Sequence, residues 1–464
     1  MVWTFRIPPC STEYRYPLDN SFYIYMITKN KKMRKLLLSM LLLLVQQLYG
    51  QTGKHVIMVT LDGLRPEFYL SADWNTPNLK QLVKEGAFAE GVVSVFPAMT
   101  FPAHTTMVTG VAPANHGIFY NGVFNPDATN GGIYWNFKQM KSPTVWEAAH
   151  QAGLKVASLV WPVSAEAPVD FNIPDIGGMG NEVLEKYSVP VGMTTILKRD
   201  VLGGKEKIDI SNDMDVAKIA AWMIKNKQPN LMTIHMFGLD HKEHEFGREG
   251  VEIQKAIAKA DSCVGIIRDA IRDAGLQDST LLIVLGDHGF YDIEKSVNPN
   301  VLLARAGLLR NTADDWDAQF NTVGGGAFLF VKNNDKKIIA QVEKILKDLS
   351  ADEKKYFRMV KASEMKKIGA DPNAVFALSA LNGASFGSTY KGDFIKPGKG
   401  GTHGHFPDTK KIQTGFMAVG NTVKPNSNLK EMRLYDVAPI ILQYLNLNLD
   451  SQLKGEVPKG LFKK

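Results

Sequence analysis

The chain has 464 residues, of which 45% are hydrophobic and 22% charged, with 54 Lys and Arg against 47 Asp and Glu. Most of the positive excess lies in the first 50 residues, which hold seven basic and two acidic side chains and leave 47 against 45 in the remainder. A nearly neutral remainder gives no case for nucleic-acid binding by charge.

The first 50 residues have the pattern of an export signal. A basic segment beginning at Met33 leads into the apolar run LLLSMLLLLV, and Gly50 followed by Gln51 offers a cleavage point. The apolar run is too short to span a bilayer comfortably, so we expect no stable membrane span after cleavage. Residues 1–50 are therefore predicted to be a leader with translation starting at Met33, and the mature protein is expected to be periplasmic or secreted by a bacterium.

Cysteine usage limits the chemistry of the mature chain. Cys10 falls in the predicted leader, which leaves Cys263 alone. Neither an intramolecular disulfide nor a thiolate metal site of the CxxC type is expected. A chain of this length and apolar content can bury a large core, so we expect one large α/β domain with a smaller insertion.

Predicted strands and helices alternate along the chain. The run VIMVTL at 56–61 is typical of a buried parallel strand, and it ends at Asp62. Thr76 and Pro77 form an N-cap and first-turn pair for a helix over 78–86. Further helices are predicted at 144–152, 213–225, 250–274 and 435–445, and further strands at 154–161, 231–237 and 280–285. This βαβ rhythm predicts a doubly wound, mostly parallel sheet flanked by helices.

The alternation loosens between residues 294 and 399. A Gly-rich strand is predicted at 324–331 and a Lys-rich helix at 335–349. The glycines give no phosphate loop, because no GK[ST] follows them. We therefore predict that 294–399 is a smaller inserted subdomain and that 51–293 and 400–464 form the main domain.

Thr100 is a candidate site residue because it lies at a predicted turn that leads into a helix. It stands between an apolar segment ending at Phe96 and the sequence FPAHTTMVTG, whose later part is predicted to be helical. A hydroxyl at such a turn can point at a ligand, and a helix N-terminus favours an anion. Threonine there is more often a helix cap than a nucleophile, so a catalytic role needs support from the rest of the chain.

Four segments supply that support, because in each an apolar or Gly-rich stretch ends in a residue able to bind a metal. The candidate ligands are Asp62, Asp240, His244, Asp287, His288 and His403. The carboxyl ends of parallel strands meet at one edge of an open α/β sheet, so these side chains can converge there. Oxygen and imidazole ligands without thiolates fit zinc in a two-metal site, and they also suit manganese or iron.

The segments that carry a wider resemblance are VTLDGLRPEF, TPNLKQLVKEGA, FPAMTFPAHTTMVTGVAPANHGIFYN, VWP, GLDHKEHEFG, GDHGF and GTHGHFPD. In this order they resemble the nucleotide pyrophosphatase/phosphodiesterase (type I phosphodiesterase) family of the alkaline phosphatase superfamily. The resemblance covers nearly the whole mature chain. It implies an alkaline phosphatase-like sheet and a catalytic core formed by the main domain.

The resemblance also implies roles for single residues. Thr100 is the expected nucleophile and also a ligand of the first metal, together with Asp62, Asp287 and His288, whereas Asp240, His244 and His403 are expected to hold the second. Asn121 and the backbone N–H of Phe101 are expected to donate hydrogen bonds to a phosphoryl oxygen. Phe101 and Trp161 are expected to contact the substrate, although Val163 stands where the family usually has Gly. Five other histidines, His104, His116, His235, His241 and His405, are not expected to be ligands.

The function implied by the resemblance is a two-zinc hydrolase of phosphodiester or pyrophosphate bonds. Small nucleotides are the expected substrates, and a phospho-threonine on Thr100 is the expected intermediate. A phosphomonoesterase of this superfamily would carry Lys and Arg after the VWP-like strand, where this chain has VSAEAPVDF. A phosphonoacetate hydrolase of the same superfamily is a further alternative, whereas a sulfatase would need Cys or Ser in place of Thr100. A non-catalytic binding protein is the least expected, because it would lack a metal ligand or the nucleophile and all seven positions are present. The leaving group, the metal and the oligomeric state are left open.

Overall fold

Strand β1 (His55–Leu61) lies inside an eight-stranded sheet, and all seven of its residues are buried. The computed structural model describes residues 35, 39, 53–126, 131–311 and 314–464. Strand β1 pairs in parallel with β6 (Leu231–Met236) on one side and β7 (Thr280–Leu285) on the other. Because the three strands run in the same direction, their carboxyl ends lie together at one edge of the sheet.

The order of strands in the main sheet is β18 (Ser427–Asn428), β2 (Ala87–Phe88), β17 (Phe416–Val419), β7, β1, β6, β4 (Val156–Leu159) and β5 (Phe171–Ile173). Strand β17 is antiparallel to both neighbours, and the other pairs are parallel. The predicted mostly parallel α/β sheet is therefore confirmed.

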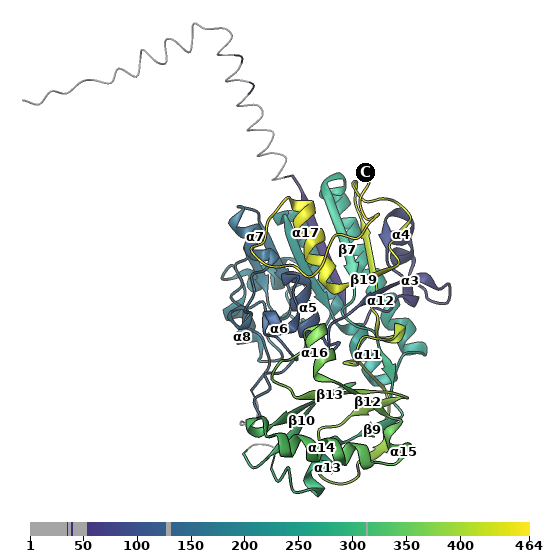
Figure 1. Ribbon diagram of the computed structural model, residues 1–464. Helices are drawn as coiled ribbons and strands as arrows, with labels where there is room; N and C mark the ends of the chain where they lie inside the picture. The colour runs from purple at the N-terminus through teal and green to yellow at the C-terminus, as the bar shows by residue number, and fades with distance from the viewer. Residues whose placement is uncertain (1–34, 36–38, 40–52, 127–130, 312–313) are drawn as a thin grey trace, which may run out of the picture. The chain divides into compact units, whose positions relative to one another are not determined.

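Alternate residues of β1 enter two hydrophobic layers, one on each face of the sheet. Ile57 and Val59 belong to the layer that contains apolar residues of α4 (Pro77–Glu85), α10 (Asp213–Lys227) and α12 (Val251–Asp273). Val56 and Met58 belong to the layer that contains residues of α5 (Thr100–Thr109), α7 (Val145–Gln151) and α17 (Val437–Leu445). The period of two along the strand thus specifies helices on both faces (Figure 1).

Other elements connect these layers. The remaining helices are α3 (Glu67–Leu70), α6 (Pro113–His116), α8 (Asn181–Tyr187), α9 (Met193–Asp200), α11 (Gly238–Phe246), α13 (Pro299–Arg305), α15 (Ala351–Lys354) and α16 (Ala362–Ile368). Small sheets pair β14 (Ala384–Phe386) and β15 (Ile395–Pro397) with β9 (Lys295–Val297), β16 (Gly401–Thr402) with β8 (Tyr291–Asp292), and β19 (Glu431–Arg433) with β3 (Gly91–Val93).

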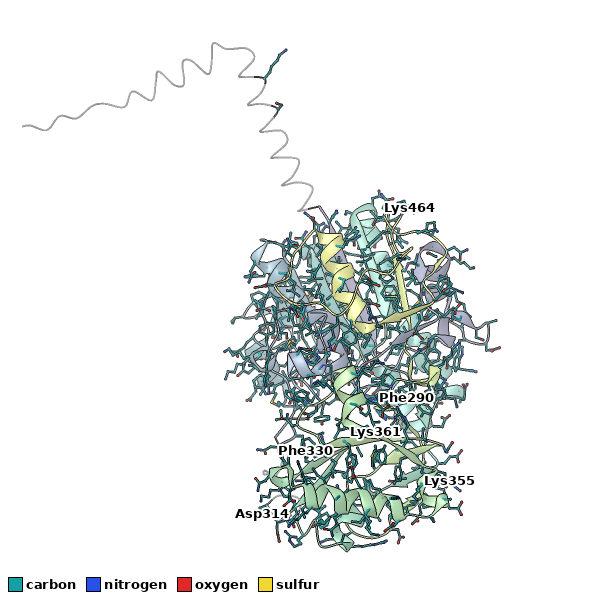
Figure 2. All side chains as sticks on the ribbon, viewed as in Figure 1. Phe290, Asp314, Phe330, Lys355, Lys361 and Lys464 are labelled. Carbon is teal, nitrogen blue, oxygen red and sulfur yellow. The ribbon has the colours of Figure 1, made fainter. Side chains whose placement is uncertain are left out.

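A second, antiparallel sheet has the order β10 (Ala318–Val323), β11 (Gly326–Val331), β13 (Phe376–Ala380) and β12 (Phe357–Val360). Its hydrophobic cluster includes Val342 and Leu346 of α14 (Lys336–Asp348). Figure 1 shows this sheet and α14 together at one end of the fold, and Figure 2 labels Phe330 there. All four strands lie within the predicted subdomain at 294–399, and the boundaries of that subdomain stay a prediction.

Two predictions about single elements differ from the structure, one because of a local backbone conformation and the other because of a contact with another helix. The strand predicted at 154–161 is shorter, because Val160 has a φ of 57° and its left-handed conformation ends β4. Thr76 occupies the N-cap position of α4, but its hydroxyl donates to the carbonyl of Phe68 instead of capping the helix. The buried carboxylate of Asp261 on α12 accepts from the backbone N–H of Leu79 at 2.8 Å and caps the helix in its place.

The predicted leader lies outside the described residues, apart from Lys35 and Ser39, and so do Met33, Gly50 and Gln51. The chain divides into a unit of residues 1–52 and a unit of residues 53–464, and the description that follows concerns the second. Within the described residues, no helix combines the length and apolar character needed to cross a bilayer.

One buried hydrogen bond joins the main domain to the second sheet's subdomain. The hydroxyl of Tyr120 donates to Asp371 Oδ2 at 2.8 Å, and both side chains are buried. We predict that Tyr120→Phe lowers the free energy of unfolding by about 1.5 to 3 kcal/mol, because a carboxylate loses a donor inside the protein. Urea unfolding measures this loss. Tyr134→Phe is the matched control, since the hydroxyl of Tyr134 makes no hydrogen bond with any described residue, and equal effects of the two changes would contradict the prediction.

Candidate active site

The edge of the main sheet where β7, β1 and β6 end carries three aspartates. Asp62 follows β1 directly, and Asp287 follows β7 after one glycine. Asp240 lies in the first turn of α11, the helix that begins shortly after β6. Because these strands are neighbours in the sheet, residues far apart in the chain lie at one place.

Asp62, Asp287 and His288 form the first of two candidate metal-binding groups. His288 Nε2 lies 3.2 Å from Asp62 Oδ1 and 3.2 Å from Asp287 Oδ2. All three side chains are buried. The backbone N–H of Gly63 donates to Asp287 Oδ1 at 3.1 Å, which leaves Oδ2 directed at the group.

Asp240, His244 and His403 form the second group. Asp240 Oδ1 lies 3.4 Å from His244 Nε2 and 3.8 Å from His403 Nε2. The other ring nitrogens are held by backbone carbonyls, with His244 Nδ1 3.0 Å from the oxygen of Gly401 and His403 Nδ1 2.9 Å from that of Ala98. These contacts fix the orientations of both rings and leave Nε2 of each ring available to bind a metal ion.

The two groups adjoin each other through their histidines. The rings of His288 and His403 are stacked, with centroids 3.6 Å apart and planes at 6°. A metal ion held by one group would therefore lie beside a metal ion held by the other.

The spacing of these atoms fits divalent metal ions. In a tetrahedral zinc site with bonds of 2.0 to 2.2 Å, neighbouring ligand atoms lie about 3.3 to 3.6 Å apart, close to the separations within both groups. Asp62 Oδ1, Asp240 Oδ1, Asp287 Oδ2 and His288 Nε2 are buried and have no hydrogen-bond partner among the described residues. Buried polar atoms without partners are costly, so their convergence indicates a bound cation. The donor set fits zinc, as the sequence predicts, without identifying the metal.

Close packing of carboxylates perturbs their pKa values in opposite directions. Burial would raise the pKa of Asp62, but the facing His288 and His235 outweigh it and hold this pKa well below its ordinary value. Burial and the charge of Asp62 raise the pKa of Asp287 to about 7 and raise that of Asp240 well above its ordinary value. Asp62 is thus ionised, and its negative charge disfavours ionisation of Asp287 and Asp240.

The pKa values of His288 and His403 also shift in opposite directions. Burial opposes the charged form of His288, but Asp287 and Asp62 raise its pKa to about 10. Burial and the nearby His288 hold the pKa of His403 well below its ordinary value. His288 therefore carries a proton at neutral pH that a metal ion would displace, whereas His403 is already neutral.

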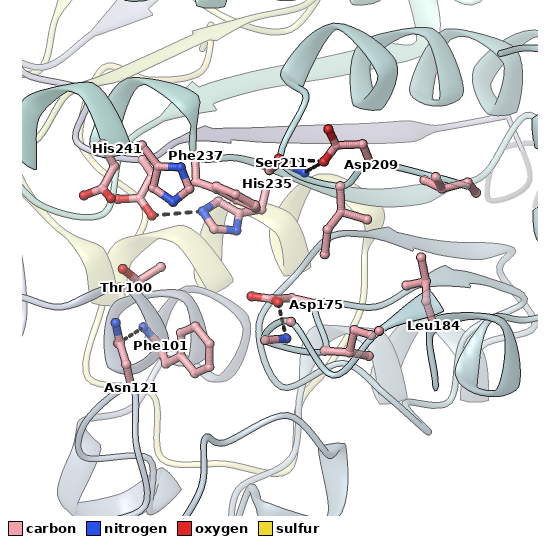
Figure 3. A pocket seen from close by; sticks show the side chains of 18 of the residues that line it. Thr100, Phe101, Asn121, Asp175, Leu184, Asp209, Ser211, His235, Phe237 and His241 are labelled. Atoms are coloured by element: carbon pink, nitrogen blue, oxygen red, sulfur yellow. Dashed lines mark hydrogen bonds and ion pairs between the residues drawn. The ribbon is translucent and has the colours of Figure 1, made fainter. Parts of the chain in front are cut away.

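Thr100 is the first residue of α5 and not its cap. Met99 occupies the N-cap position, and the hydroxyl of Thr100 makes no hydrogen bond with any described residue. The Thr100 side chain lines a pocket together with Asp62 and Asp240, one carboxylate from each candidate group. Figure 3 shows it facing His235 across this pocket. The position at a helix N-terminus is the one that the sequence predicts for a residue acting on an anion.

Asn121 and Phe101 lie together beside Thr100. The backbone N–H of Phe101 donates to Asn121 Oδ1 at 3.0 Å (Figure 3). This N–H, which was expected to donate to a phosphoryl oxygen, is therefore engaged with the asparagine. Because Oδ1 is held in this way, the donor Nδ2 of Asn121 is left for a ligand.

The pocket has a volume of about 620 Å³. Its walls beyond Thr100 come mainly from 175–184 and 207–211, with Phe101, Ile176, Leu184, Ile208 and Phe237 as apolar members. The first of these segments lies between β5 and the end of α8, and the second follows α9. Lys207 is the one lysine or arginine among the described residues that line the pocket.

Trp161 is placed differently from its expected position on the pocket wall. The indole is fully buried and packs edge-on against His104 and Trp146, with ring centroids 4.7 and 6.3 Å apart. It belongs to the hydrophobic layer under α5 and α7, so the prediction of a substrate contact is wrong for this structure. Val163, with a φ of 57°, packs against Phe101 instead.

Several site residues were not predicted from the sequence. His235 Nε2 lies 3.1 Å from Asp62 Oδ2, and burial of this ring is outweighed by Asp62, which raises the pKa of His235. Asp175 lines the pocket, and burial raises its pKa. Burial also raises the pKa of Glu243 to about 8, because the opposing charges of Arg65 and Arg248 offset the burial only in part. The position of His235 at the end of a strand beside β1 was the available signal for that residue.

The chain matches a family model described as type I phosphodiesterase / nucleotide pyrophosphatase over residues 56–404. It is 25% identical over 404 residues to the venom phosphodiesterase CdcPDE of Crotalus durissus collilineatus, covering 84% of this chain and 44% of that protein. It is 24% identical over 406 residues to ectonucleotide pyrophosphatase/phosphodiesterase family member 7 of Rattus norvegicus, covering 86% of this chain and 84% of that protein. The chain thus spans less than half the length of the venom phosphodiesterases that it matches.

Two solved structures share the fold. Human ectonucleotide pyrophosphatase/phosphodiesterase 5 aligns with a TM-score of 0.65 and 18% identity over 87% of this chain and 97% of that chain. The murine counterpart, an inactive form in complex with AMP, aligns with a TM-score of 0.65 and 21% identity over the same shares. The alkaline phosphatase-like architecture predicted from the sequence is confirmed by this similarity.

Metal binding should release protons. The pKa of His288 is raised to about 10 and that of Asp287 to about 7, so in the metal-free protein the first is protonated and the second partly protonated at pH 7. A metal ligand must give up its proton, so zinc affinity should rise as the pH increases from about 6 to 9. Calorimetric titration of the metal-free protein with Zn²⁺ in two buffers of different ionisation enthalpy measures the protons released.

The exposed His150 provides the control, because His150→Gln should leave the number of released protons unchanged. A zinc affinity independent of pH, with no proton released, would show that the ligand set is already deprotonated.

Proposed function

Because the chain belongs to the type I phosphodiesterase / nucleotide pyrophosphatase family, as its motifs predict, we propose that it is a two-metal hydrolase of phosphodiester or pyrophosphate bonds with Thr100 as nucleophile. The observation that carries the proposal is the arrangement of two three-ligand groups beside a pocket that contains an unbonded threonine hydroxyl. Zinc is the proposed metal.

The residues that would hold the metal ions are Asp62, Thr100, Asp287 and His288 for the first, and Asp240, His244 and His403 for the second. When bound, such ions lower the pKa of a coordinated hydroxyl and offset negative charge on phosphoryl oxygens. Without that help, a threonine hydroxyl is a poor nucleophile at neutral pH.

In the proposed reaction the phosphoryl group is first transferred to Thr100 and then to water. Thr100 Oγ1 loses its proton and forms a bond to phosphorus while the bond to the leaving oxygen breaks. The leaving oxygen takes up a proton from solvent, which gives a phospho-threonine and the first product. Water then attacks the same phosphorus and releases the second product with the threonine restored. Asn121 Nδ2 donates to a phosphoryl oxygen, and its amide needs no reorientation because the N–H of Phe101 holds Oδ1.

Nucleotides are the proposed substrate class. Phe101 and Phe237 give the pocket two aromatic side chains, and the remaining apolar wall suits a planar base. Asp175 Oδ1 accepts from the N–H of Gly177 at 2.8 Å, and the carboxylate lies inside the pocket (Figure 3). A carboxylate there can accept hydrogen bonds from an amino group of a base. The AMP in the murine structure of similar fold agrees with this choice.

One observation favours a phosphomonoesterase instead. Lys207 lines the pocket from a segment other than VSAEAPVDF, where a monoesterase of this superfamily is expected to carry its cations. The Lys207 side chain is exposed, and no second cation accompanies it among the described pocket residues. A diester, which carries less charge than a monoester, therefore remains the better match. The export signal predicted from the sequence makes a periplasmic or secreted enzyme part of the same proposal.

Replacing the nucleophile tests the diesterase against the monoesterase. Thr100→Ala should lower kcat for bis(p-nitrophenyl) phosphate by at least about 10³-fold, because no other group can form the covalent intermediate. The zinc-loaded wild type should hydrolyse this diester faster than p-nitrophenyl phosphate. Both rates are followed by absorbance of p-nitrophenol, with metal content measured in the same samples.

Thr109→Ala in the same helix is the control, because the hydroxyl of Thr109 bonds only to local backbone groups, donating to the carbonyl of Thr105 and accepting from the N–H of Val111. A faster rate with the monoester would favour the phosphomonoesterase. Failure to hydrolyse either ester with two metal ions bound would favour a phosphonate substrate or a binding protein.

The role of Asp175 tests the nucleotide proposal. Asp175→Ala should lower kcat/KM for adenosine 5′-(p-nitrophenyl) phosphate by about 10-fold or more, because a hydrogen bond to a charged group contributes about 1.5 to 3 kcal/mol. Hydrolysis of bis(p-nitrophenyl) phosphate, which has no amino group, should change by less than about twofold. Asp209→Asn is the matched control in the same pocket, since the carboxylate of Asp209 already accepts a hydrogen bond from the hydroxyl of Ser211. Equal losses with both esters would rule out recognition of the base by Asp175.

A further inference from the structure

A fully buried ion pair lies beneath the candidate metal site. Arg65 follows Asp62 by three residues, and its Nε lies 2.7 Å from Glu243 Oε1, with both side chains fully buried. Glu243 is on α11 between the ligands Asp240 and His244. The pair therefore joins a segment that carries one candidate group to the helix that carries the other.

The Arg65 guanidinium is held on every side. It donates from Nη1 to Glu67 Oε1 and from Nη2 to the carbonyl of Arg248, both at 2.6 Å. It also lies over the rings of Phe68 and Trp74, 4.3 and 5.5 Å from their centroids. A guanidinium fixed by planar hydrogen bonds and stacking is a rigid anchor and not a mobile counter-ion.

A third ligand segment joins the same network. The backbone N–H of Arg248 donates to Asp292 Oδ1 at 2.7 Å, and its guanidinium donates to the carbonyl of Phe290, two residues after His288. Arg248 also contacts Glu67, which Arg65 binds as well. Segments that follow β1, β6 and β7 are thus connected by one set of charged side chains.

The close fit at Gly63 shows how tightly the pair is packed against the site. A Cβ at this glycine would lie 2.5 Å from Glu243 Oε2, and its φ of 74° is one that other residues adopt at a cost. The carboxylate therefore rests directly on the backbone between Asp62 and Arg65. Any shift of Glu243 would be transmitted to the residue that follows the Asp62 ligand.

We propose that the Arg65–Glu243 pair is a positioning element that fixes the segment of Asp62 against the helix of Asp240 and His244, and so sets the spacing of the two metal sites. This inference rests on the proposed two-metal function. Neither residue belongs to the candidate ligand groups, so both act through the backbone segments that they join.

Stability alone is a weak explanation for the pair. Removing two charges from water is expensive, and replacing a buried ion pair with apolar side chains is often neutral or stabilising. Apolar side chains cannot reproduce the polar contacts that fix the register of neighbouring segments. These contacts are the ion pair with Glu243 and the hydrogen bonds from Arg65 to Glu67 and to the carbonyl of Arg248. Contacts outside the ligands themselves commonly change metal affinity by about 10- to 100-fold.

The decisive variant removes both charges together. Arg65→Met with Glu243→Leu leaves no buried charge unpaired, so the protein should fold with a urea midpoint close to that of the wild type. We expect its Kd for Zn²⁺, measured against a competing chelator, to increase by about 10- to 100-fold. The visible absorption spectrum of the Co²⁺-substituted protein should change as well, since it reports ligand geometry independently of turnover.

Glu243→Gln is the second variant, because it keeps the shape of the side chain while removing its charge. It should weaken zinc binding by a smaller factor, and it keeps the inference testable if the double variant does not fold. The matched control is Arg268→Met with Glu85→Leu, which removes an ion pair of 2.6 Å between α12 and α4, away from the site. Zinc affinity and the Co²⁺ spectrum should not change in this control.

The outcomes separate the two proposals. A wild type that binds fewer than two Zn²⁺ ions would contradict the proposed function, whatever the variants do. A wild type that binds two, with folded Arg65 and Glu243 variants of unchanged zinc affinity and unchanged Co²⁺ spectrum, would overturn the positioning role. Equal changes in the Arg268 and Glu85 control would also overturn it, because the effect would then be one of general stability.

Discussion

Mutual repulsion among three buried aspartates is the constraint on which the site depends. Asp62, Asp240 and Asp287 lie where adjacent parts of the sheet end, and burial leaves little water to screen their charges. Histidines lower this repulsion in the metal-free protein, and the opposite pKa shifts of Asp62 and Asp287 show that the compensation is uneven. Cations would complete it, so the same arrangement that strains the empty site would give it affinity for metal.

Sequence patterns sufficed where a residue ends an element and failed where contacts cross the fold. The strand at 280–285 and the candidate ligands Asp62 and Asp287 were predictable, because a buried strand ending in a carboxylate leaves a local signal. Trp161 was misplaced because the left-handed turn at Val160 precedes it, which no propensity indicates. Asp175 and Glu243 were missed because the roles of their side chains depend on residues that are distant in the chain. For the same reason the sequence did not show that a carboxylate of another helix caps α4 in place of Thr76.

Among the described residues, the two β-branched ones with a positive φ lie next to the site. Val160 and Val163 both have a φ of 57°, a conformation that costs a β-branched residue about 1 to 3 kcal/mol. The carbonyl of Val160 lies 3.2 Å from Nδ1 of His235, and the side chain of Val163 packs against Phe101. The two strained positions therefore support the partner of Asp62 and the aromatic wall of the pocket. A glycine at Val163 would relieve the strain but would remove the side chain that holds Phe101.

His403 follows the whole antiparallel sheet in the chain, whereas its stacking partner His288 precedes that sheet. The second ligand group is therefore incomplete until nearly all of the chain has been synthesised and the antiparallel sheet has brought its two ends together. Contacts of this long range form late and slowly in folding. A metal ion bound across these contacts, as proposed, would stabilise the finished protein and add to the barrier against unfolding, but it would give little guidance to the chain as it folds.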